Sequence, residues 1–271
     1  MSFHGKEPLT YGSADNLKIG TVVCVPLQNR LVNGIVVEQS SKPTFEAKSI
    51  LETIEVGSIP VALLSLVKWL SSYYPGPLGI TASMLLPNNI NNKALAKVPE
   101  NNKIRKTRQT TLPPLTKEQL GVIKQLDELG NKSALLHGDT GSGKTRIYID
   151  QAVKTMKRNR SVLVLTPEIG LTPQLMKSFS DNFPNQTILV HSKLTPAQKR
   201  NNWLRIITSD QPLVIIGPRS ALFSPVSNLG LIIMDEAHDA AYKQEQSPHY
   251  QTSRVAAKLA QEHQAKFILG T

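Results

Sequence analysis

Short apolar runs recur between longer amphipathic segments in the second half of the chain. They lie at residues 134–137, 161–165, 187–190, 213–216, 231–234 and 267–269. Their apolar positions are consecutive rather than alternate, as in strands buried on both faces of a parallel sheet. Helical segments separate most of them, and two begin with a capping-box pattern, at Thr116 and at Thr195. The pattern predicts an α/β domain whose parallel sheet has helices on each side.

The first part of the chain has a different pattern. β-Branched runs at residues 21–26 and 34–38 are broken by the turn-forming residues Asn29, Asn33 and Gly34. Such runs predict a small twisted sheet or barrel. Residues 48–54 are expected to add another strand.

A helix is predicted at residues 61–74, where apolar residues recur at helical spacing after Pro60. The Pro-Gly-Pro sequence at residues 75–77 ends it. Aromatic side chains near its end either stack on nucleic-acid bases or form part of the core, the commoner role. They belong to Trp69, Tyr73 and Tyr74.

Residues 88–114 are expected to form a linker, because they hold an asparagine cluster and end in two prolines. Their basic residues, opposed by Glu100 alone, are Lys93, Lys97, Lys103, Arg105, Lys106 and Arg108. This segment is either a solvated tether or a strip that contacts phosphates. The predicted organisation is a β-rich domain at 1–88, a basic linker at 89–115 and an α/β domain at 116–271.

A glycine-rich loop follows directly on the apolar run at 134–137. It reads Gly-x-x-x-x-Gly-Lys-Thr, the pattern of a phosphate-binding loop. Glycines let backbone N–H groups surround phosphate oxygens, and the helix expected at 146–158 points its N-terminus at the same anion. Lys144 would reach the β- and γ-phosphates of ATP, and the Thr145 hydroxyl would hold Mg²⁺. The candidate nucleotide-binding residues are Gly138, Asp139, Thr140, Gly141, Ser142, Gly143, Lys144 and Thr145.

The sequence Asp-Glu-Ala-His begins where the apolar run at 231–234 ends. A carboxylate at the end of a buried strand beside a phosphate loop can complete the Mg²⁺ shell, which makes Asp235 the metal candidate. Glu236 would orient and deprotonate the attacking water. His238 would link the nucleotide site to the next motif. The alternative, that the acidic pair only caps a helix, is weakened by the phosphate loop.

The charge of the chain indicates a class of partner. Lys and Arg outnumber Asp and Glu by 31 to 20, a formal net charge of +11. This excess favours a polyanionic partner, nucleic acid first and an anionic membrane surface second. We expect a cytoplasmic protein without a membrane span, because no run reaches about 18 apolar residues and the N-terminus lacks a signal-peptide core. The single cysteine, Cys24, excludes an internal disulfide and a cysteine-rich zinc site in this chain.

Together, the two nucleotide-site motifs resemble those of superfamily 2 helicases of the DEAH type. The longer segments 166–174 and 217–225 narrow the resemblance to the PriA-type primosomal replication-restart helicases (primosomal protein N′). The resemblance implies ATP and Mg²⁺ as cofactors and single-stranded DNA on loops of the motor lobe. It assigns DNA contacts to Thr166, Pro167, Glu168, Arg219 and Ser220. It also assigns the adenine side of the nucleotide to Gln119, for which a role in starting the helix is an equal alternative.

The N-terminal part resembles that family's 3′-end DNA-binding domain, which implies DNA contacts from Tyr11 and Lys48. One departure concerns the family's Phe-Asp-Tyr, which here is Leu9-Thr10-Tyr11. The carboxylate expected to receive a 3′-terminal hydroxyl is therefore missing, and we expect weak discrimination for a free 3′ hydroxyl. Residues 88–114 also leave no room for the winged-helix domain usual in the family.

The family's second motor lobe, arginine finger and zinc module would lie beyond Thr271, so zinc is expected only there and this chain is expected to hydrolyse ATP poorly by itself. The resemblance implies a 3′ to 5′ DNA helicase of replication restart, with forks, single strands, primosome proteins and single-strand-binding protein as partners. Two alternatives stay open: another superfamily 2 translocase, and a non-catalytic adaptor that binds DNA and nucleotide. DNA-stimulated ATP hydrolysis, compared between this chain and one extended by a second lobe, separates them.

Overall fold

The protein is described here from a computed structural model that covers residues 7–87, 90–92, 113–139, 141–167 and 173–271. The chain divides into two compact units. The first comprises Met1–Glu100, Thr195–Thr208 and Phe223–Ser227, and the second comprises Asn101–Leu194, Ser209–Leu222 and Asn228–Thr271. In the part of the chain that the structure describes, every helix is too short or too polar to cross a membrane.

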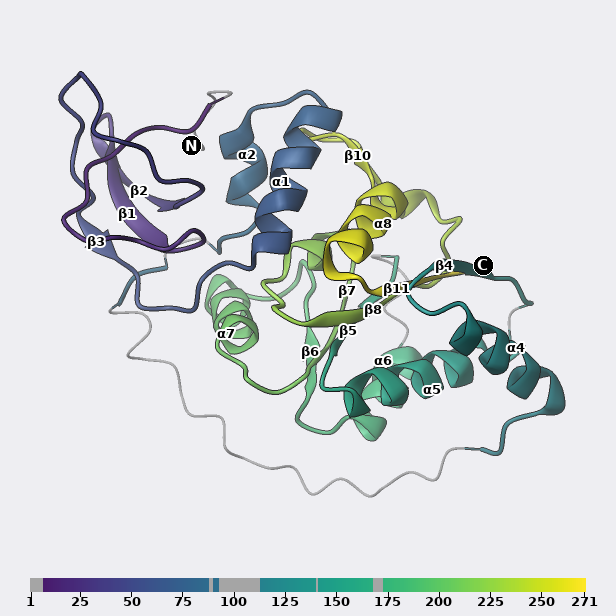
Figure 1. Cartoon of the computed structure of the whole chain (residues 1–271). Coiled ribbons are helices and arrows are strands. Elements are labelled where there is room, and N and C mark those ends of the chain that lie inside the picture. Colours follow the sequence, from purple (N-terminus) through teal and green to yellow (C-terminus); the bar gives the residue numbers. More distant parts are fainter. Residues whose placement is uncertain (1–6, 88–89, 93–112, 140, 168–172) are drawn as a thin grey trace. The chain divides into compact units, whose positions relative to one another are not determined.

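The second unit is built on a six-stranded sheet in the order β4-β11-β8-β5-β7-β6 (Figure 1). All neighbouring strands in this sheet are parallel. The strands are β4 (Ser133–Leu136), β5 (Ser161–Leu165), β6 (Thr187–Leu189), β7 (Val214–Gly217), β8 (Leu229–Met234) and β11 (Lys266–Gly270). The predicted α/β class with a parallel sheet is therefore confirmed.

Helices cover both faces of this sheet. Residues of α4 (Lys117–Glu128), α5 (Lys144–Lys157) and α6 (Pro173–Asn182) form one core cluster with side chains from five of the strands. Helix α8 (Thr252–His263) contacts β8 and β11 and lies on the other side of the sheet (Figure 1). Short elements complete the unit: η1 (Arg219–Phe223), η2 (Ala240–Tyr242), β9 (Lys243–Gln244) and β10 (Tyr250–Gln251).

Strand β4 departs from the prediction that each strand is buried on both faces. Leu136 is buried in the core cluster beneath α4 and α5, but Leu135 is 68% exposed. The reason is the place of β4 at the edge of the sheet, next to β11 alone. Successive side chains of a strand point to opposite faces, so only one face of this edge strand meets the core.

The first unit contains an antiparallel sheet in the order β2-β1-β3. Its strands are β1 (Val22–Leu27), β2 (Arg30–Ile35) and β3 (Glu52–Thr53). The predicted β-rich character is confirmed, but of the residues expected to break the β runs only Asn29 lies in the hairpin turn. Asn33 and Gly34 lie inside β2, and the hairpin turns at Gln28, whose φ is 53°. The Asn33 side chain has another use, because its amide donates a hydrogen bond to the Ile90 carbonyl at 2.8 Å.

Helices α1 (Val61–Tyr73) and α2 (Leu78–Ser83) pack together in this unit, which also includes α7 (Pro196–Ile207). The capping boxes predicted at Thr116 and Thr195 are both formed. The aromatic residues of α1 are not core residues as expected. Trp69 and Tyr73 stack with ring centroids 4.9 Å apart, and Tyr73 is 50% exposed.

The start of the predicted linker belongs to the first unit. Ile90 is 2% exposed, and the Asn92 amide group donates to the Glu52 carboxylate at 2.7 Å and to the Thr53 carbonyl at 3.0 Å. Residues 93–112, which carry most of the basic side chains of the linker, lie outside the described residues. The boundaries at 88 and 115 therefore stay predictions.

Candidate functional site

The glycine-rich loop connects β4 to α5 in the predicted order of strand, loop and helix. Gly141 and Gly143 each have a φ of 86°, a left-handed conformation that residues with a Cβ rarely adopt. Gly143 is also the N-cap residue of α5, so the first N–H groups of this helix face the loop. Thr140, another predicted member of the loop, lies outside the described residues.

Lys144, the first residue of α5, turns its side chain back over the loop. Its ammonium group donates hydrogen bonds to the Gly138 carbonyl and, at 3.4 Å, to the Asp139 carbonyl. The loop is fastened at its base, where the Gly138 N–H donates to the Thr271 carbonyl at 3.0 Å. The lysine thus lies among backbone groups that can surround a phosphate.

Asp235 stands directly after β8, where its N–H donates to the Leu165 carbonyl at 2.9 Å. The Tyr148 hydroxyl donates to its Oδ1 at 3.0 Å. Burial raises the pKa of the Asp235 carboxyl, while the hydrogen bond from Tyr148 and the charge of Lys144 act in the opposite direction. A half-buried carboxylate that a cation would stabilise, with a threonine hydroxyl at the start of the neighbouring helix, suits the oxygen preference of Mg²⁺. The chemistry of these residues therefore fits Mg²⁺, and the assignment of Asp235 and Thr145 as its ligands stays a prediction.

An unusual backbone conformation sets the direction of the Glu236 side chain. Its φ is 47°, in the left-handed region that costs energy for a residue with a Cβ. The chain thereby turns sharply after β8, and the Ala237 N–H donates to the Gly270 carbonyl at 2.7 Å. The Glu236 carboxylate is 41% exposed and lies 3.7 Å from Nε2 of His238. Both acidic residues are half-buried, but Asp235 accepts a hydrogen bond from Tyr148, whereas the Glu236 side chain stays 41% exposed.

His238 connects this turn to the last residue of the chain. Its Nδ1 lies 2.9 Å from the Thr271 hydroxyl, and the Thr271 N–H donates to the Leu136 carbonyl at 3.1 Å. The link runs from the acidic turn to the start of the phosphate loop. His238 is thus tied to Thr271, and its predicted role in linking the nucleotide site to a further motif stays a prediction.

Gln119 takes part in the capping box of α4 and also reaches the phosphate loop. Its side-chain oxygen accepts a hydrogen bond from the Thr116 N–H at 3.1 Å, and its amide group donates to the Ser142 carbonyl at 3.5 Å. A methyl group on Gly143 would overlap this amide. The geometry accommodates both roles considered for Gln119, so its contact with adenine stays a prediction.

The DNA contacts predicted in the second unit differ in accessibility. Thr166 is 1% exposed and Pro167 is also buried, whereas Ser220 is exposed. The guanidinium of Arg219 donates to the carbonyls of Ala241 and Lys243, so it also holds η2 and the start of β9. Glu168 lies outside the described residues. Ser220 and Arg219 are thus better placed than Thr166 for a direct DNA contact.

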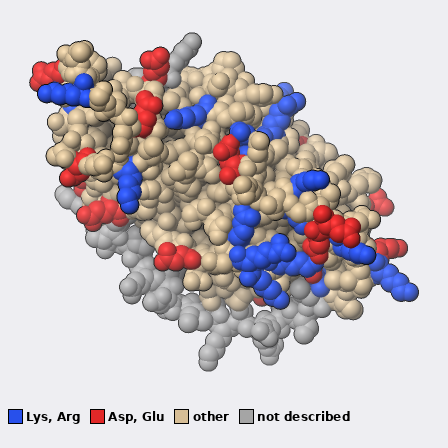
Figure 2. All heavy atoms as spheres, in the orientation of Figure 1, with Lys and Arg blue, Asp and Glu red and all other residues tan. Residues whose placement is uncertain are grey.

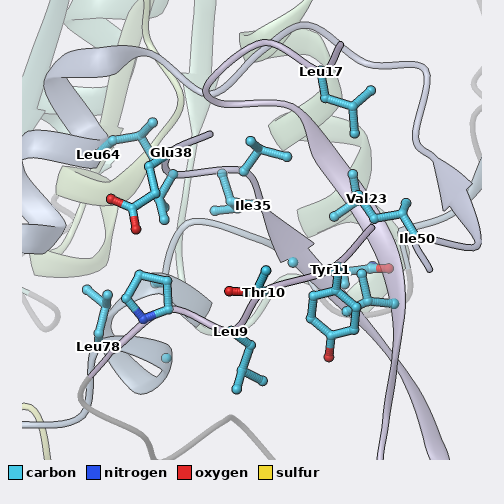
Figure 3. A pocket seen from close by; sticks show the side chains of 18 of the residues that line it. Leu9, Thr10, Tyr11, Leu17, Val23, Ile35, Glu38, Ile50, Leu64 and Leu78 are labelled. Carbon is cyan, nitrogen blue, oxygen red and sulfur yellow. The ribbon is translucent and has the colours of Figure 1, made fainter. Parts of the chain in front are cut away.

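The first unit contains a cavity of about 580 Å³ between its sheet, its N-terminal segment and helices α1 and α2. Thr10 and Tyr11 line it, and Figure 3 shows both on the same segment along one wall. The Tyr11 hydroxyl donates to the Pro26 carbonyl at 3.0 Å. The Lys48 carbonyl accepts a hydrogen bond from the Gly12 N–H at 2.9 Å, which places Lys48 beside this wall. The Lys48 side chain is exposed. The structure thus brings Tyr11 and Lys48 together from distant parts of the sequence.

Other residues of these sites had no signal in the sequence. Glu38 and Lys68 line the cavity, and Figure 3 shows Glu38 on the side of Leu64 and Leu78. Tyr148 contacts Asp235 from within an ordinary amphipathic helix. Each of these residues meets its site only through pairings between distant segments, so a single sequence cannot single them out.

Charged side chains of both signs are spread over the face shown in Figure 2, and Lys and Arg gather near its centre. Among the described residues there is no cluster of three or more His, Cys, Asp and Glu side chains suited to a metal ion. The predicted Mg²⁺ site does not need one, because Mg²⁺ is usually held by one or two protein groups together with substrate phosphates and water.

Comparisons with known proteins find a family model for each of the two parts of the chain. Residues 116–271 match the DEAD/DEAH box helicase model, and residues 3–87 match the 3′ DNA-binding domain (3′BD) model of PriA. Replication restart protein PriA of Helicobacter pylori strain J99 is 35% identical over 97% of this chain, and that of Rickettsia prowazekii is 39% identical over the same share. This chain spans 40% of the length of each.

Two further comparisons cover smaller shares of the chain. PriA of Bacillus subtilis is 42% identical over 58% of the chain, which spans 20% of that protein. The Hef helicase domain of Pyrococcus furiosus has a TM-score of 0.42 and 22% identity, covering 56% of this chain and 31% of that one. Since the helicase model matches more than half of the residues, the chain belongs to the DEAD/DEAH box helicase family.

Proposed function

We propose that this chain works as the ATP-driven and DNA-binding part of a DNA helicase of replication restart. The observation that carries the proposal is the meeting of the phosphate loop and the Asp235–Glu236 turn, joined through Tyr148 and Thr271. The relatives, which are named replication restart proteins, support the restart role. Movement from 3′ to 5′ and work at stalled forks with primosome proteins and single-strand-binding protein belong to the same proposal.

The proposed work of the nucleotide site follows from its side chains. Lys144 exchanges its carbonyl partners for the β- and γ-phosphates of ATP, and the N–H groups at the start of α5 contact the same oxygens. Asp235 and Thr145 hold Mg²⁺, which would neutralise charge on the phosphates. Glu236, accessible beside Asp235, orients the attacking water and takes its proton.

The proposed DNA contacts fall in both units. In the second unit Arg219 and Ser220 offer a cation and a hydroxyl, groups that bind phosphates without reading bases. In the first unit the match to a 3′ DNA-binding domain supports the cavity at Thr10 and Tyr11 as the site for a strand end. Lys48 and Lys68 supply positive charge for phosphates near that cavity.

The test is ATP hydrolysis measured with and without single-stranded DNA at fixed salt. The proposal expects Mg²⁺-dependent turnover that DNA stimulates, however slow, and that Arg219→Ala makes less responsive to DNA. Lys258→Ala, which removes a half-buried cation paired with Glu262 at 2.7 Å on α8, is the matched control and should leave the stimulation intact. Absence of any ATP turnover, by a chain that still binds DNA and nucleotide, would favour the non-catalytic adaptor instead.

A further inference from the structure

Tyr148 is a buried polar residue that the proposed chemistry does not yet use. It lies on α5 four residues after Lys144, so both side chains project from the same face of the helix. Tyr148 is 0% exposed, and its hydroxyl donates a hydrogen bond to Oδ1 of Asp235 at 3.0 Å. This bond directly joins the phosphate-loop helix to the strand end that carries the expected Mg²⁺ ligand.

Gly270 on β11 makes the approach of Tyr148 possible. A Cβ at this position would overlap the Tyr148 hydroxyl, would stand 2.9 Å from its Cζ and would lie 3.5 Å from Oδ1 of Asp235. The carbonyl of Gly270 also accepts a hydrogen bond from the Ala237 N–H at 2.7 Å. Three elements, α5, β8 and β11, thus converge on the Asp235 carboxylate.

A second tyrosine holds the backbone of the same residue. The Tyr242 hydroxyl donates to the Asp235 carbonyl at 2.6 Å, and Tyr242 is 3% exposed. With its N–H bonded to the Leu165 carbonyl, the main chain of Asp235 is fixed on both sides. The carboxylate itself accepts hydrogen bonds from the Glu236 backbone N–H and from the Tyr148 hydroxyl, so Tyr148 supplies a side-chain contact that restricts its rotation.

We propose that Tyr148 is a positioning residue for Mg²⁺, which orients the Asp235 carboxylate by donating to Oδ1 and leaves its remaining lone pairs for the metal. A carboxylate accepts at about four lone-pair sites, so one donated bond restricts its orientation without blocking coordination. Partners that hold metal ligands in this way typically change metal affinity about 10- to 100-fold when removed. The inference rests on the proposed nucleotide site and adds to it a residue outside the predicted motifs.

The alternative is that Tyr148 only fills the core, where its ring packs in the cluster beneath the sheet. Tyr148→Phe separates the two roles, because it keeps the ring and removes only the hydroxyl. The matched control is Tyr250→Phe, which removes the hydroxyl of another buried tyrosine of the same unit, one that is 3% exposed. Thermal unfolding of both variants reports how much each hydroxyl contributes to folding.

The decisive readout is binding rather than turnover. The dissociation constant of a non-hydrolysable ATP analogue is measured with excess Mg²⁺ and with EDTA, and the ratio gives the gain that the metal provides. Tyr148→Phe is expected to reduce this gain about tenfold or more while leaving the affinity in EDTA within about twofold. Tyr250→Phe is expected to keep the gain of the unmodified chain.

The two possible failures have different signatures. If the unmodified chain gains affinity with Mg²⁺ and Tyr148→Phe keeps that gain within about twofold, the positioning role is wrong and the proposed function stands. If the unmodified chain shows no gain with Mg²⁺, the proposed function fails and the inference fails with it. Equal loss of affinity with Mg²⁺ and with EDTA would also overturn the positioning role, because it would indicate a structural effect.

Discussion

At the nucleotide site, the backbone conformation of Glu236 decides where its carboxylate lies. Glu236 keeps a φ of 47° although it has a Cβ, and this strained turn separates its carboxylate from that of Asp235. Strain of this kind costs of order 1–3 kcal/mol and persists where surrounding contacts enforce it. Here the hydrogen bonds of Asp235 and Ala237 on either side enforce it. The arrangement suits the proposed roles, one carboxylate for the metal and one for water.

Glu236→Gln is expected to bind ATP as the unmodified chain does but to hydrolyse it at least about 100-fold more slowly. Glutamine keeps the size of the side chain and loses the base, and a positioned base contributes about 10²- to 10⁴-fold. Single-turnover phosphate release and analogue binding, measured on the same preparations, check this. Glu262→Gln on α8 is a control outside the site. Normal release by the Glu236 variant would remove the proposed role of this residue.

At the residue scale, the sequence motifs predicted the groups whose spacing is local. Lys144 and Thr145 follow from the Gly-Lys-Thr pattern, and Asp235 follows from its place after an apolar run. Tyr148 does not, since its bond to Asp235 joins positions 87 residues apart. Thr166 is the opposite case. Its motif predicts a DNA contact, but its side chain is buried. Accessibility depends on neighbours that the pattern does not specify.

At the element scale, substitutions at the start of α4 test whether Gln119 has a role beyond starting this helix. Thr116→Ala removes the capping hydroxyl and should cost about 0.5–2 kcal/mol of stability without changing nucleotide affinity. Gln119→Ala should cost similar stability and also weaken nucleotide binding by roughly three- to tenfold, as expected for the loss of one neutral hydrogen bond. Urea unfolding and analogue binding measure the two effects. Equal nucleotide affinity in both variants would leave Gln119 with the capping role alone.

The last turn of α8 makes stability depend on pH through His263. Burial, together with the charge of Arg160, lowers the pKa of His263 from 6.5 to about 4. Between these values the unfolded chain binds a proton that the folded chain does not, so the free energy of unfolding falls as pH falls. Above pH 6.5 this residue contributes no pH dependence, and below about 4 its contribution is constant.

His263→Gln should therefore lose about 1–2 kcal/mol less stability than the unmodified chain when the pH changes from about 7.5 to about 5. Urea unfolding at the two pH values measures the difference. His249→Gln, at an exposed position, is the matched control. An unchanged pH dependence in the His263 variant would show that the side chain is not held neutral.

Element boundaries in the α/β unit followed from the apolar runs, most of which agree with the strands within two residues. What the runs did not predict is the order of strands, because pairing depends on contacts far apart in sequence. The exposure of Leu135 follows from that order, since it places β4 at an edge. In the first unit the same limit appears at Asn33 and Gly34, whose turn preference yields to pairing with β1.

For the whole molecule, a net charge of +11 and the match of residues 3–87 to a 3′ DNA-binding domain support DNA as the proposed partner. A more specific prediction concerns the first unit. There Thr10 lines the cavity at the position where the resemblance implies a carboxylate. A threonine hydroxyl accepts a hydrogen bond more weakly than a carboxylate. Discrimination between a 3′ hydroxyl and a 3′ phosphate should therefore be less than tenfold, or about 1.4 kcal/mol.

Thr10→Asp should raise that discrimination to tenfold or more, since a hydrogen bond to a charged group contributes about 1.5–3 kcal/mol. The measurement compares one oligonucleotide with either terminus at fixed salt. Ser13→Asp, at another residue lining the cavity, controls for added negative charge. If the unmodified chain already prefers the hydroxyl tenfold, another acceptor operates in the cavity, and Glu38→Gln identifies it if the preference then disappears.

The central claim is that the phosphate loop of this family member binds a nucleoside triphosphate through Lys144. Calorimetric titration of a non-hydrolysable ATP analogue with Mg²⁺ into the unmodified chain and into Lys144→Ala tests it most directly. We predict one site per chain, and an affinity in the variant that is lower by about tenfold or more, because the ammonium group is a charged partner of the phosphates. Absence of binding by the unmodified chain, or equal affinity in the two proteins, would contradict the account.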